Sequence, residues 1–254
     1  MLDYDDEAAV YDATRGGVPR AEAAATAVLG LIPPGARSLL DIGCGTGLVT
    51  ERIAAGRPGL RVSGTDAALG MARVAKQRVG GVALADARRL PLRDGAVDAV
   101  TAVWLLHLLR GDGDVRAVVA QAARVLRPGG VFVATVDKDA SHDVASDIDA
   151  AFAPYLAPSP SDATDRVIGY GAECGLDVVG SAVFRGHGQG RTPMSAARGV
   201  RRGYYVSRLE LPGAAADRLI EDLAALPDQD RCRAEPEYRL LAMRRGPGTG
   251  PTRV

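Results

Sequence analysis

Hydrophobic positions in the first half of the chain form short continuous runs that alternate with segments of helical spacing. The apolar run at 39–42 predicts a buried strand, and the spacing over 48–55 predicts a helix directly after it. Residues 61–65 and 82–85 predict two further strands, separated by a second helix that ends near Arg78. This βαβαβ order predicts an α/β fold with a mostly parallel sheet and helices on both faces.

The second half continues the pattern with weaker boundaries. Four more apolar runs are typical of strands: 97–103, 131–136, 177–185 and 237–244. Helical spacing precedes the first strand at 21–31 and separates the later strands at 115–126 and 162–174. Residues 141–155 predict another helix, and Thr192-Pro193 can open one more, with Thr192 as its cap.

Length and charge narrow the classes of protein. The 254 residues, 47% of them hydrophobic, suit one large domain, which we expect over 1–245, followed by a disordered Gly/Pro-rich tail at 246–254. The net charge is zero, which makes nucleic acid an unlikely partner because such binders usually carry a basic surplus. Abundant Ala and Gly with scarce Lys suggest a GC-rich, bacterial genome.

The cysteines and the chain start indicate neither a metal site nor an export signal. Cys44, Cys174 and Cys232 lie far apart without metal-ligand spacing, so we expect reduced thiols and no metal. Residues 1–7 are acidic, unlike a signal peptide, and no apolar run approaches 18 residues. We therefore expect a cytoplasmic protein that does not bind membranes.

A glycine-rich turn between the first strand and its helix is the clearest candidate ligand site. It reads Asp-Ile-Gly-Cys-Gly-Thr-Gly over 41–47. Glycines let the backbone approach a ligand closely, and the following helix directs unpaired N–H groups to the same place. The turn does not fit the dinucleotide pattern G-x-G-x-x-G, whose third glycine would fall at Leu48. A glycine-rich turn without a ligand is the alternative.

This turn resembles motif I of the class I S-adenosylmethionine (SAM) dependent methyltransferases, written (D/E)-x-G-x-G-x-G. Its fixed positions are occupied by Asp41, Gly43, Gly45 and Gly47. Residues 90–100 and the phrase R-V-L-R-P-G-G at 124–130 are similar to two further segments of these enzymes, and the family's aspartate at Asp98 is more often structural than catalytic. The resemblance implies a Rossmann-like, seven-stranded sheet of order 3-2-1-4-5-7-6, with strand seven antiparallel. It also implies a small helical lid, drawn from 1–30, 138–160 and 186–211.

Acidic residues at the ends of the second and third strands extend the resemblance. Asp66 lies 23 positions after Gly43, where a carboxylate can accept hydrogen bonds from ribose hydroxyls. The family's D-x-S-x-x-M pattern begins at Asp66. The sequence has Ala68 where the pattern has serine, and this change removes a helix cap but no group that takes part in the chemistry. Asp86-Ala87 resembles the family's (G/A)-D-A pattern, in which the acid accepts from the adenine amine and the alanine N–H donates to the ring.

The resemblance implies SAM as cofactor and S-adenosyl-L-homocysteine as product. The candidate cofactor-binding residues are Tyr11, Arg15, Asp41, Gly43, Cys44, Gly45, Asp66, Ala67, Met71, Asp86, Ala87 and Trp104. Tyr4, Tyr11 and Arg15 resemble the N-terminal segment that closes over SAM in related enzymes, and Arg15 can pair with the SAM carboxylate. An ordinary solvated helix is the alternative for this segment. Trp104, the only tryptophan, is expected to wall the pocket.

The candidates for acceptor binding and catalysis are weaker. His107, at the carboxyl end of the fourth strand, is the candidate catalytic base; Asp137, Tyr155 and His187 are others. The candidate substrate residues are Tyr155, His187, Arg202 and Tyr205. Residues 186–211 resemble a T-P-x-x-A…R-x-Y-S stretch of bacterial small-molecule methyltransferases, although a solvated basic helix is the alternative.

These observations predict a SAM-dependent methyltransferase (EC 2.1.1.-) acting on a small molecule such as a specialised metabolite, as a monomer or homodimer. Methyl transfer from a sulfonium is an in-line displacement that depends chiefly on positioning, and a base is needed only if the acceptor must lose a proton. A peptide- or protein-directed methyltransferase and a non-catalytic SAM-binding module are the alternatives. An RNA methyltransferase disagrees with the charge, and a nicotinamide reductase with Leu48.

Overall fold

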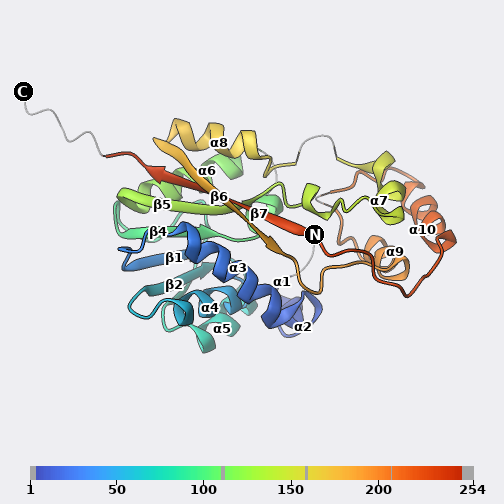
Figure 1. The fold of residues 1–254 in the computed structure, drawn as a ribbon, viewed down its shortest axis with the longest axis horizontal. Coiled ribbons are helices and arrows are strands. Elements are labelled where there is room, and N and C mark those ends of the chain that lie inside the picture. The colour runs from blue at the N-terminus through green and yellow to red at the C-terminus, as the bar shows by residue number, and fades with distance from the viewer. Residues whose placement is uncertain (1–3, 110–111, 158–159, 207, 248–254) are drawn as a thin grey trace, which may run out of the picture.

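The centre of the protein is a seven-stranded sheet of order β3-β2-β1-β4-β5-β7-β6. The computed structural model describes residues 4–109, 112–157, 160–206 and 208–247 (Figure 1). The pairs among the first five strands are parallel, whereas β7 is antiparallel to both β5 and β6. The predicted α/β class, strand order and antiparallel seventh strand are therefore confirmed.

The strands lie close to the predicted ranges. Their bounds are β1 Ser38–Ile42, β2 Arg61–Asp66, β3 Val82–Leu84, β4 Val97–Ala102, β5 Leu126–Val136, β6 Leu176–Arg185 and β7 Glu237–Arg245. The strand predicted at 131–136 starts earlier than expected, because β5 already begins at Leu126. Leu126 is buried and pairs with Val97 before the register shifts, so this glycine-containing stretch is an irregular start of the strand.

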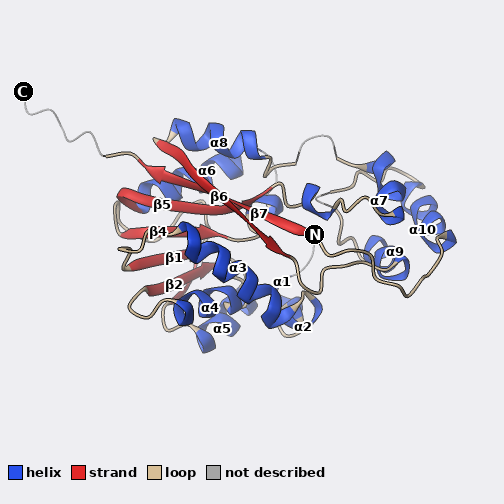
Figure 2. Cartoon of the chain, in the orientation of Figure 1, coloured by secondary structure: helices blue, strands red, loops and turns tan. Residues whose placement is uncertain are grey.

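Helices cover both faces of the sheet (Figure 2). The bounds are α1 Tyr4–Glu7, α2 Tyr11–Thr14, α3 Gly17–Leu31, α4 Leu48–Gly56, α5 Leu69–Arg78, α6 Asp112–Val125, α7 Asp147–Phe152, α8 Thr164–Glu173, α9 Pro193–Arg201 and α10 Ala215–Ala225. The helices α6 and α8 lie on one side and α3, α4 and α5 on the other. Three short 3₁₀ turns add Leu106–Leu108, Ala140–His142 and Ala153–Tyr155.

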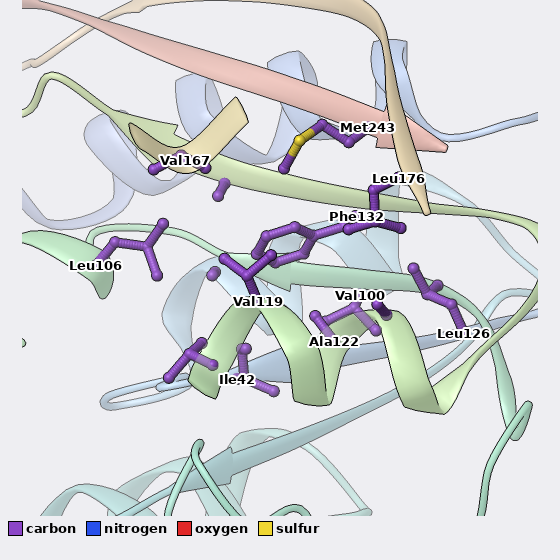
Figure 3. Close-up of a cluster of buried hydrophobic side chains, with 14 of the residues drawn as sticks. Ile42, Val100, Leu106, Val119, Ala122, Leu126, Phe132, Val167, Leu176 and Met243 are labelled. Carbon is purple, nitrogen blue, oxygen red and sulfur yellow. The ribbon is translucent and has the colours of Figure 1, made fainter. Parts of the chain in front are cut away.

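The largest hydrophobic cluster joins α6 and α8 to the sheet (Figure 3). Phe132 of β5 and Val119 of α6 are fully buried there, and Met243 of β7 closes the cluster from the antiparallel strand. Burial of such side chains stabilises the fold by roughly 1.5–3 kcal/mol each. This core holds the sheet rigid beneath the loops at the strand ends.

A separate hydrophobic cluster holds α7, α9 and α10 together beyond one end of the strands, at the right of Figure 1. We call these three helices the lid cluster. Ser146 caps α7 and Thr192 caps α9, each within a capping box, and Pro193 follows Thr192 as predicted. The helix α10 was not predicted, although Ala215, Leu219 and Leu223 are buried at helical spacing.

The expected single helix over 141–155 is wrong. Residues 140–142 form a 3₁₀ turn, α7 starts at Asp147, and Ala153–Tyr155 is a second 3₁₀ turn. The break has a local cause, since Ala145 has a positive φ of 54° and Ser146 begins α7 by accepting from the Asp149 N–H. Of the predicted tail, 248–254 lies outside the described residues.

Candidate functional site

The glycine-rich turn leaves β1 and enters α4 through positive backbone angles. Gly43 and Gly45 have φ of 66° and 57°, a region that side chains disfavour. A Cβ on Gly43 would lie 2.7 Å from the Leu105 side chain, whereas one on Gly45 would meet nothing within 4 Å. The backbone at Gly45 is therefore open on one side, where a ligand can approach it.

That open side faces a cavity of about 460 Å³, within the size range of small-molecule sites. All twelve candidate cofactor-binding residues line it, and so does Tyr4. They come from the N-terminal helices and from the ends of β1, β2, β3 and β4. Because parallel strands end at one edge of the sheet, motifs far apart in the chain converge there.

Asp66 is fixed at the cavity wall by backbone donors. The Gly45 N–H donates to Oδ2 at 2.8 Å, and the Ala68 N–H donates to Oδ1 at 2.9 Å. Burial raises the pKa of Asp66 above its ordinary value, although these backbone donors oppose the shift. Each carboxylate oxygen keeps a lone pair for a further donor, so the geometry fits a ligand with neighbouring hydroxyls.

Asp41 is only 2% exposed and lies beneath the turn. Its two oxygens accept from the Thr50 and Thr101 hydroxyls at 2.6 and 2.7 Å. Burial raises the pKa of Asp41 to about 6. These bonds tie β1 to α4 and β4, so the carboxylate positions the turn as well as lining the cavity.

Asp86 is held by Arg88, a residue that sequence analysis did not single out. The Arg88 Nε and Nη2 atoms lie 3.0 and 2.8 Å from the Asp86 carboxylate, and Nη1 lies 2.8 Å from Asp114. Hydrogen bonds from Arg88 hold the pKa of Asp86 below its ordinary value. Arg88 lies two positions after Asp86, and this short spacing is the signal by which sequence analysis could have found the pair.

Asp98, expected to be structural, joins the start of β4 to β1. Its Oδ2 accepts from the backbone N–H of Arg37 and from the Ser38 N–H and hydroxyl, while Oδ1 lies 2.7 Å from Arg127. The carboxylate lies outside the set of residues lining the cavity. This contact network agrees with a structural role.

The N-terminal segment is fastened over the cavity by polar contacts. The Asp12 carboxylate accepts from the Thr46 hydroxyl and pairs with Arg78, both at 2.7 Å. The Arg15 guanidinium lies over the Tyr204 ring at 4.9 Å, which links this segment to residues following α9. The segment thus packs onto the glycine-rich turn, as the resemblance implied for a lid.

Trp104 forms the wall opposite the turn with a strained backbone, at a φ of 55°. The Arg20 guanidinium stacks on its ring at 3.6 Å, and the Phe184 and Tyr238 rings meet it edge-on at 5.5 Å. Its Nε1 is buried without a hydrogen-bond partner among the described residues. Sequence analysis did not single out Arg20, which links this wall to α3.

Two histidines lie beyond this wall. His107 does not line the cavity itself, although its neighbours Leu105 and Leu108 do. His142, which the sequence analysis passed over, lies 3.1 Å from the Tyr238 hydroxyl through Nε2. Both imidazoles keep some exposed surface, yet burial, and then the charge of Lys138, lowers their pKa well below 6.5. Each imidazole is therefore neutral at pH 7, and its lowered pKa makes it a weaker base than an ordinary histidine.

The structure does not gather the four candidate substrate residues in one place. Tyr155 and Tyr205 pack in the lid cluster, Tyr205 against Phe152 at 5.0 Å. Arg202 is exposed and donates to the Tyr204 hydroxyl, and His187 is exposed beside Glu235. Their roles remain predictions.

Asp137, the remaining base candidate, is engaged in fold contacts. Its carboxylate accepts from the backbone N–H and the hydroxyl of Thr164, at the start of α8. Arg239 lies 3.9 Å away. This carboxylate therefore fastens α8 to the end of β5.

The cysteines and possible metal ligands of the described residues complete the description of the site. Cys44 is buried in the cavity wall, and Cys174 and Cys232 are free thiols elsewhere. Within the described ranges no three His, Cys, Asp or Glu side chains form a group that can hold a metal ion. In the same ranges no helix is both long and apolar enough to cross a membrane.

Comparison with known proteins shows what the central part of the chain is similar to. Residues 40–134, from β1 to β5, match the family described as "Methyltransferase domain". This match covers less than half of the chain, and the part that holds the glycine-rich turn is therefore similar to a methyltransferase domain.

Curated relatives resemble the same part of the chain. A malonyl-(acyl-carrier protein) O-methyltransferase of Geobacter sulfurreducens is 34% identical over 137 residues, which are 50% of this chain and 48% of that protein. A ubiquinone/menaquinone biosynthesis C-methyltransferase, UbiE, of Desulfotalea psychrophila is 37% identical over 101 residues, 38% and 40% of the two chains. The chain thus spans about half, or less, of the length of these relatives.

Solved structures share the fold over nearly the whole chain. The (4+2)-cyclase SpnF aligns with a TM-score of 0.62 at 17% identity, covering 96% of this chain and 95% of that one. Geranyl diphosphate C-methyltransferase from Streptomyces coelicolor A3(2), solved with S-adenosyl-L-homocysteine, aligns with a TM-score of 0.53 at 16% identity, covering 88% and 78%. At these identities the likeness shows the fold alone.

Proposed function

We propose that the protein transfers a methyl group from SAM to a small-molecule acceptor. One observation carries the proposal: the Asp66 carboxylate lies beside the open backbone of Gly45, inside a cavity that the N-terminal segment closes. At the carboxyl ends of the parallel strands, a ligand can therefore donate its hydroxyls to Asp66 and approach the Gly45 backbone closely. Relatives whose names state methyl transfer to small or carrier-bound acceptors support the proposal.

The residues present fit SAM. Asp66 would bind the ribose hydroxyls, and Asp86 with the Ala87 N–H would bind the adenine edge. Arg15, whose Nε is buried without a partner among the described residues, would bind the amino-acid carboxylate. When bound, SAM supplies a methyl group on a sulfonium whose leaving group is neutral. The chain's own contribution is orientation and the exclusion of water by Trp104 and the N-terminal segment.

A small acceptor is favoured over a peptide by the elements that cover the site. Helices α1 and α2 lie against the cavity, and the lid cluster stands beyond the strand ends (Figure 1). A covered site suits a small acceptor that is enclosed in the cavity better than a peptide that must extend beyond it. A second candidate, a protein of this fold that does not transfer methyl groups, is favoured by the likeness to a structure named as a cyclase.

The proposal is tested by following S-adenosylhomocysteine formation from SAM with a panel of carboxylic acids, phenols, amines and thiols. We expect acceptor-dependent product with at least one class, and a product mass higher by one methylene group. Binding of SAM without turnover on any class would instead favour the non-catalytic alternative.

The role of His107 is tested separately from SAM binding. We expect His107→Ala to leave S-adenosylhomocysteine affinity unchanged within about twofold, since the imidazole does not line the cavity. If His107 is the base, turnover falls by about 10²–10⁴-fold. Turnover equal to the wild type would assign the residue to packing, and His142→Ala provides the matched comparison.

A further inference from the structure

A cluster of buried charges lies between the cavity and the lid cluster. Asp149 of α7, Arg191 and Arg208 are all less than 9% exposed. One Asp149 oxygen, Oδ1, serves both arginines, at 2.5 Å from Arg191 Nη2 and 3.4 Å from Arg208 Nη2. Both guanidiniums also flank the Phe152 ring, at 5.3 and 5.4 Å.

Arg191 and Arg208 together carry more positive charge than Asp149 carries negative charge. Arg208 Nε and Nη1 are buried without a hydrogen-bond partner among the described residues. Arg191 Nη1 is likewise buried without a hydrogen-bond partner among the described residues, and the Arg191 side chain interacts with Tyr205. Burying an incompletely paired guanidinium costs several kcal/mol, so an arrangement with free donors is poorly explained by stability alone.

The cluster is connected to the cavity wall through two routes. The Arg191 Nη2 also donates to the His142 carbonyl at 2.6 Å, and His142 bonds Tyr238, whose ring packs on Trp104. On the other side, Tyr205 lies within the electrostatic reach of both arginines and of Arg15. The arginines therefore lie outside the cavity lining, with His142 and Tyr238 between Arg191 and Trp104.

Positive charge gathers at this end of the site. The cations are Arg15, Arg20, Lys138, Arg191 and Arg208, and the carboxylates near them are Asp137, Asp139, Asp149 and Asp162. Asp139 pairs with Lys138 at 3.0 Å, so one more cation than carboxylates remains even with Asp162 counted as charged. The cavity lining itself includes the carboxylates of Asp41, Asp66 and Asp86, of which Asp86 pairs with Arg88.

We propose that the acceptor carries an oxyanionic group, a carboxylate or a phosphate ester, which binds against Arg208, Arg191 and Lys138. This inference rests on the proposed function and names its substrate class. Guanidiniums present donors in a planar fork that matches an oxyanion, and a desolvated setting strengthens each such bond. Phe152 and Tyr205 supply an apolar wall beside the anion, so an aromatic or aliphatic acid suits the site better than a free inorganic ion.

The test uses protein saturated with S-adenosylhomocysteine and three probes with one ring: benzoate, phenyl phosphate and benzamide. Trp104 is the only tryptophan and walls the cavity, so its fluorescence reports binding nearby, with calorimetry as a second readout. We expect benzoate or phenyl phosphate to bind at least about tenfold more tightly than the neutral amide. The better of the two anions distinguishes a carboxylate from a phosphate ester.

Variants assign the effect to the cluster. Arg208→Gln is expected to weaken binding of the better anion by about tenfold or more, and Arg208→Lys by less. Lys138→Gln, with a side chain 20% exposed, provides a second variant if Arg208→Gln fails to fold, with an expected loss of about fivefold. Arg198→Gln removes an exposed charge from α9 and is the matched control, with no change expected.

The outcomes separate this inference from the proposed function. Failure of the wild-type protein to bind S-adenosylhomocysteine contradicts the proposed function. Normal binding of S-adenosylhomocysteine, together with equal affinity for benzoate and benzamide or with no binding of any probe, overturns the anionic acceptor. Anion affinity that is unchanged in the folded Arg208 and Lys138 variants overturns the assignment to this cluster.

Discussion

Asp41 and Asp66 end neighbouring strands, but their surroundings give them different tasks. Thr50 and Thr101 occupy both oxygens of Asp41 beneath the turn, while backbone donors hold Asp66 at the cavity wall. The two motifs that begin with these acids therefore name one residue that supports the turn and one that we propose binds the ribose.

We expect Asp66→Ala to weaken S-adenosylhomocysteine binding by about 1–3 kcal/mol, because the ribose hydroxyls would lose a charged acceptor and Gly45 its partner. Isothermal titration calorimetry measures the change. Asp177→Ala, an exposed acid on β6, is the control and should bind as the wild type does. Affinity of Asp66→Ala equal to that of the control would refute the ribose assignment.

The raised pKa of Asp41 predicts a pH-dependent stability. An acid whose pKa is about 6 in the folded state and near 3.8 when unfolded holds its proton more tightly in the folded protein. Its contribution to the free energy of unfolding therefore rises as the pH falls from about 7 towards 4. At pH 7 the buried charge costs up to about 3 kcal/mol.

We expect Asp41→Asn to remove this cost, so that the variant gains stability relative to the wild type at pH 8 and loses about half of that advantage by pH 5. Urea unfolding at the two pH values measures the difference, in which Asp162 and other shared groups cancel. Asp177→Asn should show no such trend. A difference between Asp41→Asn and the wild type that is independent of pH would contradict the prediction.

At the residue scale, sequence analysis predicts which residues lie together where their position depends on a strand end. Apart from Tyr11 and Arg15 of the N-terminal segment, the candidate cofactor-binding residues converge because β1, β2, β3 and β4 are parallel and end together. It fails for residues such as Arg191, whose partner Asp149 lies 42 positions away on another element. No periodicity marks such a pair, because only the packing of the lid cluster brings the two segments together.

At the scale of elements, the lid cluster is held by its own small core. Leu219 and Leu223 of α10 pack with Ile148 and Phe152 of α7, apart from the clusters that hold the sheet. Capping residues start α7 and α9, so local signals and a separate apolar contact both define this unit. It can therefore open without unfolding the sheet.

We expect Leu219→Ala to loosen the lid cluster selectively, because deletion of a fully buried leucine costs about 2–5 kcal/mol. Hydrogen exchange should accelerate in α7, α9 and α10 but not in β4 or β5, with S-adenosylhomocysteine affinity within about threefold of the wild type. Arg218→Ala, exposed on the same helix, is the control. Acceleration that is equal in the sheet would show that the cluster is not a separate unit.

Element prediction from the sequence was least successful in this region. The run over 141–155 has helical spacing, but Ser146 and Asp149 form a capping box that starts a new helix inside it. The missed α10 spans 11 residues and carries Ala215, Leu219 and Leu223 at helical spacing, so its pattern was present in the sequence and was overlooked.

At the scale of the whole molecule, negatively and positively charged side chains lie in separate regions around the site. Carboxylates near the carboxyl ends of β1, β2 and β3 line the cavity, and Lys138, Arg191 and Arg208 gather outside its lining, with the two arginines next to α7 of the lid cluster. A chain with no net charge thus offers two distinct environments to two ligands. The sheet order, which the motifs implied correctly, is what sets these regions apart.

The central claim, a SAM site at the glycine-rich turn, is tested most directly by calorimetric titration of the purified protein with S-adenosylhomocysteine, with NADH as the control ligand. We expect a dissociation constant on the order of 1–100 μM for the first ligand and no measurable binding of the second. Binding of NADH in place of S-adenosylhomocysteine, or of neither ligand, would contradict the account.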